Sequence, residues 1–324
     1  MADQRSVDAP IRLLNPLPTL LGRYEFTLAQ MLEAGGHCSV CEPVPSIEMP
    51  DAAMTDRGRR GVEVARAIRQ ELGSGDGLIV CVWPAFGLAD PVVWGHRGAP
   101  PVRIVLHDPV PMRRQFGSGR LAARLGRLAM RSNIDAVVHS SVAADAVRAT
   151  GWPEPTLARH PMSAPEPRRR GGDGTIAVLG QYKPVRDLDL LGRLGPALRE
   201  RGLRPTILGR QWPDVPGWDV RDAFVPEAEL TDTIARAEAV IVPYTRYYQS
   251  GIAIRAAEVA VPVVGRRHPF LADLFGDEWP GLVGGDHVDE WLGAVEGVLA
   301  ADVAVPVTAY HQRAVADWQQ VADG

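Results

Sequence analysis

Short apolar runs that alternate with helix-length segments constrain the fold of this sequence most strongly. The runs are rich in Val, Ile and Leu, and few polar residues interrupt them. This is typical of strands in a parallel sheet that helices cover on both faces. The pattern therefore predicts an α/β fold with doubly wound sheets. The expected strands are 11–16, 37–43, 78–83, 102–108, 135–140, 175–180, 205–209, 239–244 and 262–265, and the expected helices include 24–34, 56–72, 112–132, 187–202, 227–237 and 251–260.

The 324-residue chain is expected to form two such domains. The chain is longer than a domain with a single hydrophobic core usually is, and its length suits two domains of roughly 150 residues each. One segment, SAPEPRRRGGDG at 163–174, has no apolar periodicity and is rich in Pro, Gly and charge, as linkers are. We expect domains at 1–165 and 173–302 and a terminal helix within 303–324. Ligands of such folds bind at the carboxyl ends of strands, so the cleft between the domains is the expected site.

Composition narrows the class of protein. A net charge of −4 gives no global basic field for nucleic acid. Three cysteines form no disulfide framework, and Cys38 and Cys41 suit either a strand or, as an alternative, a zinc or redox pair. The polar N-terminus lacks the apolar core of a signal peptide, and no run approaches the roughly 18 apolar residues that span a bilayer. We expect a cytoplasmic protein.

Cations follow the expected strand 175–180. In LGQYKPVRDLDLL (179–191), the strand ends at Gly180 and a helix begins near Asp187, so that Lys183 and Arg186 lie at the start of the helix. Two cations beside a helix N-terminus can hold an anionic diphosphate. The alternative is a pair of solvated surface cations.

A second helix start follows the strand that ends at Tyr244. Ser250 is a good N-cap, and Gly251 lets a ligand approach the backbone, where the N–H groups of the first turn are free. Arg255 and Glu258 follow within that helix. The carboxylate of Glu258 suits ribose hydroxyls or an i,i+3 salt bridge with Arg255, and we favour the salt bridge.

The first half contributes a histidine and a basic helix. In VLHDPVP (105–111), a strand brings His107 and Asp108 to its carboxyl end, where the histidine either contacts a substrate or is satisfied by local hydrogen bonds. In 112–132, three leucines share one helical face and four arginines another. Such a helix suits an anionic membrane surface, but we expect a solvated face above a leucine core stripe. The leucines are Leu121, Leu125 and Leu128, and the arginines are Arg120, Arg124, Arg127 and Arg131.

Several strong motifs are absent, among them the GxxxxGK[ST] phosphate loop, GxGxxG, HExxH and GxSxG. Asp187 and Asp189 form a DxD pattern that is typical of metal sites. Because they lie at an expected helix start, charge complementarity with the helix N-terminus is the favoured interpretation.

Taken together, these segments resemble a retaining glycosyltransferase of the GT-B fold, in the broad family called GT4. LGQYKPVRDLDLL resembles that family's FGxIRPYKGLDLLL, and VPYTRYYQSGIAIRAAEVAVPVVG resembles LPYRxxxTSGxLLLALSFGxPVVA. The segment 207–244 resembles one that ends in FVPDEELxxLLxAADVVVLPY, while VLHDPVP and DAVVHSS resemble VHNxxPHE and ADxVIVHS. The resemblance covers most of the chain and is strongest from 175 to 300.

The resemblance implies two Rossmann-like domains, the first for the acceptor and the second for a UDP- or GDP-sugar donor, with no metal and no other cofactor. It implies that Lys183 and Arg186 neutralise the leaving diphosphate and that His107 lies near the donor sugar, so these three are the expected catalytic residues. The expected donor-binding residues are Gly180, Lys183, Arg186, Tyr244, Ser250, Gly251, Arg255 and Glu258, and the expected acceptor-side residues are Asp108 and Gly22. The acceptor would be a glycan, a lipid-linked sugar or a small natural product.

The sequence departs from the family pattern at several positions. Lysine and arginine are exchanged at 183 and 186, and Asp187 replaces a glycine. Tyr247 and Arg255 stand where many members of the wider family have the two glutamates of an E-x7-E motif. These departures keep two alternatives open, namely a non-catalytic GT-B protein that binds a nucleotide sugar or a partner enzyme, and a sugar-nucleotide epimerase.

Overall fold

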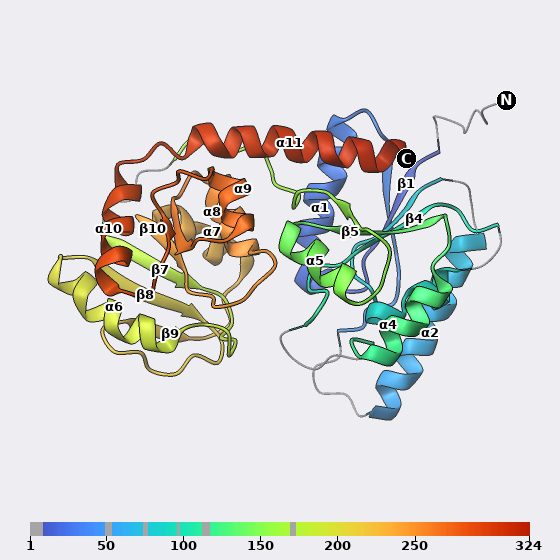
Figure 1. The fold of residues 1–324 in the computed structure, drawn as a ribbon, viewed down its shortest axis with the longest axis horizontal. Coiled ribbons are helices and arrows are strands. Elements are labelled where there is room, and N and C mark those ends of the chain that lie inside the picture. The colour runs from blue at the N-terminus through green and yellow to red at the C-terminus, as the bar shows by residue number, and fades with distance from the viewer. Residues whose placement is uncertain (1–8, 49–53, 74–76, 96–97, 112–116, 169–172) are drawn as a thin grey trace. The chain divides into compact units, whose positions relative to one another are not determined.

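The computed structural model describes residues 9–324 except 49–53, 74–76, 96–97, 112–116 and 169–172. The chain forms two compact units (Figure 1). Unit 1 comprises residues 1–161 together with 313–324, and unit 2 comprises residues 162–312. The last helix, α11 (Ala304–Asp323), therefore begins in unit 2 and ends in unit 1. Its end is fixed in unit 1 by Arg159, whose guanidinium contacts Asp317 at 2.9 Å and whose carbonyl accepts from Trp318 Nε1 at 2.8 Å.

Unit 1 contains a six-stranded parallel sheet in the order β2-β1-β3-β4-β5-β6. Helix α1 connects β1 to β2, and α2 to α5 follow the later strands. The elements are β1 (Ile11–Leu14), α1 (Pro18–Ala34), β2 (Ser39–Glu42), α2 (Met54–Gly73), β3 (Ile79–Cys81), the 3-10 helix η1 (Gly87–Ala89), α3 (Pro91–Trp94), β4 (Val102–Val105), α4 (Arg120–Ala129), β5 (Ile134–Val138), α5 (Ser141–Ala149) and β6 (Thr156–Leu157).

Unit 2 contains a second six-stranded parallel sheet in the order β12-β11-β10-β7-β8-β9. Helices α6 and α10 pack together on one face, and α7 and α8 pack together on the other (Figure 1). The elements are β7 (Thr175–Leu179), α6 (Leu188–Glu200), β8 (Arg204–Gly209), β9 (Asp219–Asp222), α7 (Glu227–Arg236), β10 (Ala239–Val242), α8 (Gly251–Glu258), β11 (Val263–Arg266), α9 (Pro269–Phe275), β12 (Leu282–Val283) and α10 (Val288–Leu299).

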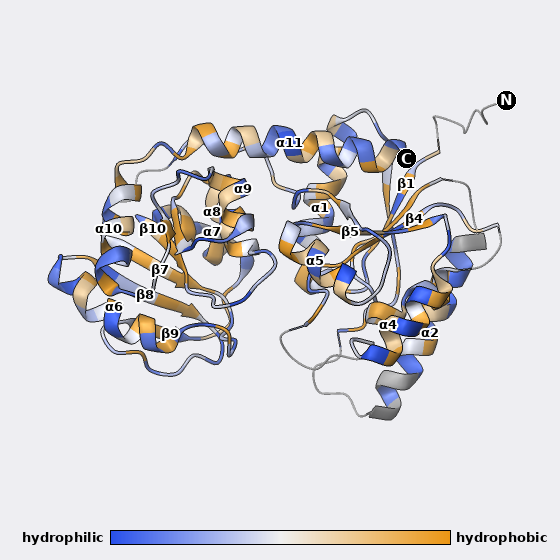
Figure 2. Cartoon of the chain, viewed as in Figure 1, coloured by the Kyte–Doolittle hydropathy of each residue, from blue (hydrophilic) through white to orange (hydrophobic). Residues whose placement is uncertain are grey.

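The two sheets confirm the predicted α/β class. The inner strands are mostly apolar because helices cover both faces, and their side chains form the core together with those of the covering helices (Figure 2). All nine predicted strands are present. Three short strands were not predicted, namely β6, β9 and β12, and each is the last strand at a sheet edge. An edge strand is paired on one side only, so it can be short or polar, as the exposed sequence DVRD of β9 illustrates.

The segment predicted as a linker is partly fixed to unit 2. The N–H groups of Ser163 and Glu166 donate to the carboxylate and the carbonyl of Glu258 at 2.9 and 2.7 Å. Arg168 binds the carbonyl of Glu238 at 3.0 Å and its carboxylate at 3.3 Å. Residues 163–168 are therefore part of this unit. The remainder of the predicted linker includes 169–172, which lie outside the described residues.

Helix α4 corrects the expected leucine core stripe. It begins at Arg120, because Gly117 has φ +77 and Gly119 precedes the helix in an extended conformation. Its leucines are exposed, and its buried residues are Ala123 and Gly126. Residues 112–116 of the predicted helix lie outside the described residues.

Candidate functional site

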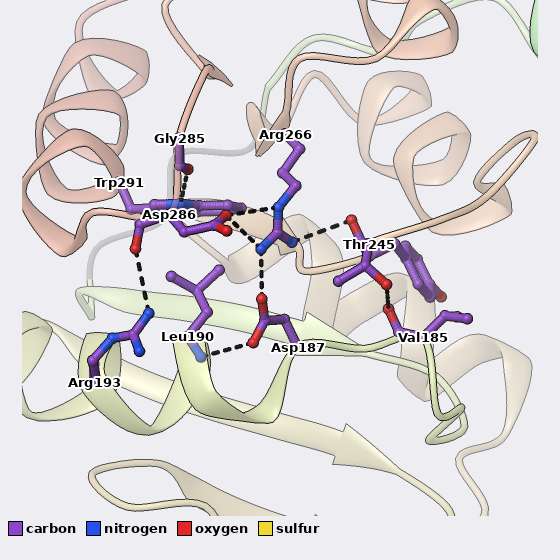
Figure 3. Close-up of polar contacts among 10 residues, drawn as sticks. Val185, Asp187, Leu190, Arg193, Thr245, Arg266, Gly285, Asp286 and Trp291 are labelled. Carbon is purple, nitrogen blue, oxygen red and sulfur yellow. Dashed lines mark hydrogen bonds and ion pairs between the residues drawn. The ribbon is translucent and has the colours of Figure 1, made fainter.

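The strand order of unit 2 marks a binding position. Ligands of doubly wound sheets bind at the carboxyl ends of strands where the order reverses. Here the chain proceeds outward from β7 in one direction and from β10 in the other, so the reversal lies between them. The loops after these strands are joined by a bridge between Arg186 and Tyr244 and by a hydrogen bond from Thr245 N–H to the Val185 carbonyl at 2.9 Å. Figure 3 shows Val185 and Thr245 facing each other across this junction.

Arg186 lies buried at this junction, with 4% of its surface exposed. Its Nη2 donates to the Leu179 carbonyl at 2.7 Å and to Tyr244 Oη at 3.0 Å. The guanidinium carbon lies 4.8 Å from the ring centroid of Trp212 and 4.9 Å from that of Tyr244. The indole N–H of Trp212 donates to the Gly180 carbonyl at 2.8 Å, which fixes that ring. Two aromatic rings and two oxygen atoms therefore hold the guanidinium in one orientation.

The charge of Arg186 is not balanced by a carboxylate within the described part of the chain. Its hydrogen bonds lead to a carbonyl and a phenol, and its buried Nε has no partner there. Burial lowers the pKa of Arg186 below its ordinary value, although Tyr244 opposes the effect. A buried cation without a counter-ion is costly. An anionic ligand at this position would supply the missing charge.

Gly180 and the start of α8 adjoin the same guanidinium. Gly180 has φ +90, and a Cβ placed on it would lie 3.1 Å from Arg186 Nη2 and 3.8 Å from Ile252 Cγ1. Ser250 caps α8 through the Ala253 N–H at 3.2 Å, as expected. The N–H groups of Gly251 and Ile252 have no acceptor within a helix. Nothing lies within 4 Å of a Cβ placed on Gly251, so a ligand can approach the backbone there.

Lys183 belongs to the same loop. Its carbonyl accepts the Arg186 N–H at 2.9 Å, which closes a turn with Pro184 at the second position. The ammonium is partly exposed and forms no ion pair with any residue that the structure describes. The structure thus brings together Gly180, Lys183, Arg186, Tyr244, Ser250 and Gly251.

An ion-pair network supports the loop after β7 (Figure 3). Asp187 caps α6 by accepting the Leu190 N–H at 2.9 Å, and its other oxygen accepts from Arg266 Nη2. Burial alone would raise the pKa of Asp187, but the Leu190 N–H and the Arg266 guanidinium together lower it below its ordinary value. Arg266 also contacts Asp286 at 2.7 Å. Asp187 is therefore a cap and an ion-pair partner, in agreement with the favoured interpretation of the DxD pattern.

Arg255 and Glu258 have other partners than we expected. Arg255 forms its ion pair with Glu227 at 2.7 Å and donates to Thr231 Oγ1 at 2.7 Å, so α8 is fastened to α7. Glu258 is buried and accepts the Ser163 N–H. The ion pair of Arg255 with Glu227 and the hydrogen bond of Glu258 with Ser163 show that each side chain holds a neighbouring segment.

Tyr247, at the first glutamate position of the family motif, is buried with 2% of its surface exposed. Its ring stacks on His268 with centroids 3.9 Å apart, and it also adjoins Tyr244 at 5.5 Å. Its hydroxyl is buried and has no hydrogen-bond partner among the described residues. Such a hydroxyl is a candidate contact for a ligand next to Tyr244.

In unit 1, His107 follows β4 and is buried. Its Nε2 donates to the Val82 carbonyl at 3.0 Å, because a carbonyl can only accept. Trp83, which follows β3, stacks on the imidazole with centroids 5.6 Å apart. Burial is the main cause that lowers the pKa of His107 to about 3, and the nearby His160 lowers it further. The ring is therefore neutral near pH 7. The predicted strand-end position is confirmed, and the histidine also makes a local hydrogen bond.

Two further histidines lie near His107. His139 and His160 follow β5 and β6, and their ring centroids lie 5.3 and 6.4 Å from that of His107. His139 Nδ1 donates to the Ala158 carbonyl at 2.7 Å, so its Nε2 accepts from Tyr24 Oη at 3.0 Å. Burial, then His160 and His107, lower the pKa of His139 well below its ordinary value. The carboxyl ends of three adjacent strands thus carry buried imidazoles.

The expected acceptor-side residues are partly accessible. Asp108 is partly exposed in the loop after β4, and Gly22 lies in α1 with nothing within 4 Å of a Cβ placed on it. Both belong to unit 1, as His107 does.

Several site residues were not identified from the sequence, namely Tyr24, His139, His160, Trp212, Arg266 and His268. The signal available for His139 and Trp212 was their position within three residues after a strand, and for Arg266 it was the position at the end of β11.

Among the described residues, no group of three or more His, Cys, Asp or Glu side chains is arranged to hold a metal ion. Cys38 and Cys41 are exposed free thiols beside or within edge strand β2. Burial, followed by the nearby Glu25, raises the pKa of Cys41 to about 11, which disfavours the reactive thiolate.

Sequence comparison identifies no matching family model and no matching curated protein. Comparison of structures does find matches. A trehalose-phosphate synthase (UDP-forming) from Burkholderia vietnamiensis has a TM-score of 0.59 at 11% identity and covers 96% of both chains. A sucrose-phosphate synthase from Thermosynechococcus elongatus has a TM-score of 0.60 at 13% identity and covers 97% of this chain and 95% of that one.

TarM is also similar, with a TM-score of 0.61 at 11% identity over 82% of this chain, which spans only 58% of TarM. A mutant of S. aureus TarM, with a TM-score of 0.55 at 11% identity over 81% of this chain and 56% of that one, was solved with fondaparinux, α-GlcNAc-glycerol and UDP. At these low sequence identities, the structural similarity establishes the fold alone. The chain has the GT-B fold, with two Rossmann-like sheets.

Proposed function

We propose that the protein is a glycosyltransferase that moves a sugar from a nucleoside-diphosphate donor to an acceptor hydroxyl with retention of configuration. One observation carries this proposal. The buried guanidinium of Arg186 lacks a carboxylate partner among the described residues and lies at the strand-order reversal, beside the first turn of α8. That combination suits a diphosphate.

The chemistry follows from this charge arrangement. As the bond between sugar and phosphate breaks, negative charge grows on the diphosphate. Arg186, Lys183 and the first N–H groups of α8 would stabilise it, and because Arg186 and the helix backbone are fixed beforehand they need little reorganisation. We propose that no divalent metal is needed and that a donor phosphate oxygen takes the acceptor proton. Full loss of turnover in EDTA that Mg²⁺ or Mn²⁺ restores would contradict this part.

Support for the substrate class comes from the sequence resemblance and from the fold. Two of the similar structures are described as UDP-forming or as complexes with UDP. A UDP- or GDP-sugar donor and a glycan, lipid-linked sugar or natural-product acceptor are therefore the classes to test. His107 is assigned to the donor sugar, and Asp108 and Gly22 to the acceptor, by resemblance.

The deciding experiment is calorimetry of the double variant Lys183→Ala/Arg186→Ala with UDP, UMP and uridine, and with the guanosine series. We expect a loss of roughly 2–4 kcal/mol for the diphosphate, on the scale of charge-assisted hydrogen bonds, with a smaller loss for the monophosphate and none for the nucleoside. Arg199→Ala/Arg201→Ala removes two cations from the end of nearby α6 and serves as the matched control. Equal losses for all three ligands would show that the diphosphate binds elsewhere.

A second candidate function is nucleotide-sugar binding without turnover. The observation in its favour is that Arg255 is engaged by Glu227 and Thr231, and that Tyr247 is buried, at positions where the family that the sequence resembles often has glutamates. Release of nucleoside diphosphate from UDP- and GDP-sugars, with and without an acceptor mixture, distinguishes the two. Binding with no release in any mixture would favour the non-catalytic protein.

A further inference from the structure

Helix α4 presents apolar side chains to solvent. Leu121, Leu125 and Leu128 are 71%, 46% and 69% exposed. Their spacing of four and three residues places them on one side of the helix. Figure 2 shows that strongly apolar and strongly hydrophilic residues alternate along α4. A row of three leucines on one helix is more than the scattered surface hydrophobics of ordinary proteins.

The outward direction of these leucines follows from how α4 packs. Its buried residues are Ala123 and Gly126, and a Cβ placed on Gly126 would lie 1.9 Å from the Leu88 carbonyl oxygen of η1. Only a helix face that is made of small residues can approach η1 so closely. At 100° per residue, the leucines lie on the opposite side from these two small residues. The leucine row is therefore directed away from the core of unit 1.

Arginines border the leucine row. Arg120, Arg124, Arg127 and Arg131 are exposed, and none forms an ion pair with a carboxylate in the part of the chain that the structure describes. Arg131 donates to the Gly95 carbonyl at 3.2 Å, which is a neutral acceptor. No Asp or Glu occurs between 112 and 134, although the whole chain carries a net charge of −4. The segment that contains α4 therefore carries positive charge and no negative charge.

We infer that α4 is a docking surface for an anionic lipid bilayer. The leucines would enter the boundary between headgroups and acyl chains, while the arginines would pair with lipid phosphates. Charge selects this occupant. A second copy that packed against the leucines would bring eight arginines together, three from each α4 and Arg131 from just beyond each helix, without carboxylates from α4. An anionic lipid surface supplies the opposite charge and an apolar layer at once.

Docking differs from crossing the bilayer. Among the described residues, no single helix is long and apolar enough to span a membrane, and α10 with α11 satisfies length and composition only as a pair bent by 87°. The inference concerns a helix that lies on the surface. It does not depend on the proposed transferase activity, because α4 contains none of the residues assigned to the donor or the acceptor.

The test is vesicle flotation of the full chain with phosphatidylcholine alone, and with a phosphatidylcholine–phosphatidylglycerol mixture in which about a third of the lipid is anionic. We expect binding to the mixed vesicles that high salt weakens. Arg120→Gln/Arg124→Gln/Arg127→Gln/Arg131→Gln should lower the partition coefficient at least about a hundredfold, since each arginine near the surface contributes roughly fivefold. Leu121→Gln/Leu125→Gln/Leu128→Gln should lower it at least about tenfold.

Matched controls come from unit 2. Arg199→Gln/Arg201→Gln/Arg204→Gln/Arg236→Gln removes four exposed arginines, and Leu299→Gln/Val305→Gln removes two exposed apolar residues. Both should bind vesicles as the wild type does. Circular dichroism should show every variant folded, because the changed α4 side chains are exposed. Equal binding to neutral vesicles, equal losses in the controls, or a wild-type oligomer that the leucine variant converts to a monomer without lipid would overturn the inference.

Discussion

Gly180 lies so near the guanidinium of Arg186 that a side chain at position 180 would press against it. A Cβ on residue 180 would lie 3.1 Å from Arg186 Nη2, while the backbone there has φ +90. The glycine at the end of β7 therefore serves two purposes, since it permits the left-handed backbone and leaves room for the buried cation. This contact connects the strand-end turn directly to the proposed diphosphate site.

Gly180→Ala should weaken both folding and ligand binding. A side chain at positive φ costs about 1–2 kcal/mol, and the guanidinium must shift by a few tenths of an ångström to make room for the new methyl group. We expect unfolding by urea to show this loss and calorimetry to show weaker UDP binding.

Gly202→Ala is the matched control for this contact. Its φ is +74, but nothing lies within 4 Å of a Cβ placed there. It should lose similar stability and keep UDP affinity. If the two variants bind UDP equally well, the contact has no bearing on the ligand.

Arg186→Met tests whether the cation is present for the ligand or for the fold. Methionine removes a buried charge that has no carboxylate partner among the described residues, together with two hydrogen bonds. Replacement of buried charges by apolar residues is often neutral, so we expect the free energy of unfolding to stay within about 1 kcal/mol of wild type. UDP affinity should fall by about tenfold or more, since a charge-assisted hydrogen bond contributes roughly 1.5–3 kcal/mol.

Arg255→Met provides the comparison. That arginine is paired with Glu227 and bound to Thr231, so its loss should lower stability and leave UDP affinity unchanged. A destabilised Arg186→Met variant with normal UDP binding would make Arg186 a structural residue.

The strands and the basic turn were predictable because local sequence determines them. β7 and β10 are apolar runs, and Lys183 and Arg186 follow a strand directly. Ser250 is a cap by its own side chain and its neighbours. The edge strands β6, β9 and β12 were missed because one-sided pairing demands little of their sequence.

Partners distant in sequence could not be predicted. Arg255 was expected to pair with Glu258 three residues away, but its partner Glu227 is 28 residues away, on α7. Similarly, Arg266 reaches Asp187 across 79 residues, and the leucines of α4 point outward because Gly126 must approach the Leu88 carbonyl. Each depends on tertiary packing, which an i,i+3 or i,i+4 pattern does not contain.

The ion pair between Asp187 and Arg266 should make stability depend on acid pH. The folded-state pKa of Asp187 lies below its ordinary value, so its contribution is complete above the unfolded pKa of about 3.9 and is lost as pH falls through the folded pKa. Asp187→Asn keeps the cap and removes the ion pair. Because the pair is partly exposed, we expect a stability difference of about 1 kcal/mol near neutral pH. Urea unfolding of both proteins should show this difference shrinking below pH about 4, and a constant difference would contradict the ion pair's role.

The buried histidines of unit 1 should also destabilise the fold in acid, and their effect should begin at a higher pH than that of Asp187. The pKa of His107 is lowered to about 3 by burial, while an unfolded histidine titrates near 6.5. Between these values the unfolded chain binds a proton that folded His107 does not, so stability decreases as pH falls below about 6.5. The slope should be about 1.4 kcal/mol per pH unit from His107 alone, and His139 should add to it, since its pKa is also depressed.

His107→Gln can still donate to the Val82 carbonyl but cannot be protonated. It should therefore be less stable near pH 7 through lost packing, with a slope smaller by about 1.4 kcal/mol per pH unit between roughly pH 6 and 4. Urea unfolding of both proteins across that range measures the two slopes, and equal slopes would mean that the folded protein accepts the proton on His107.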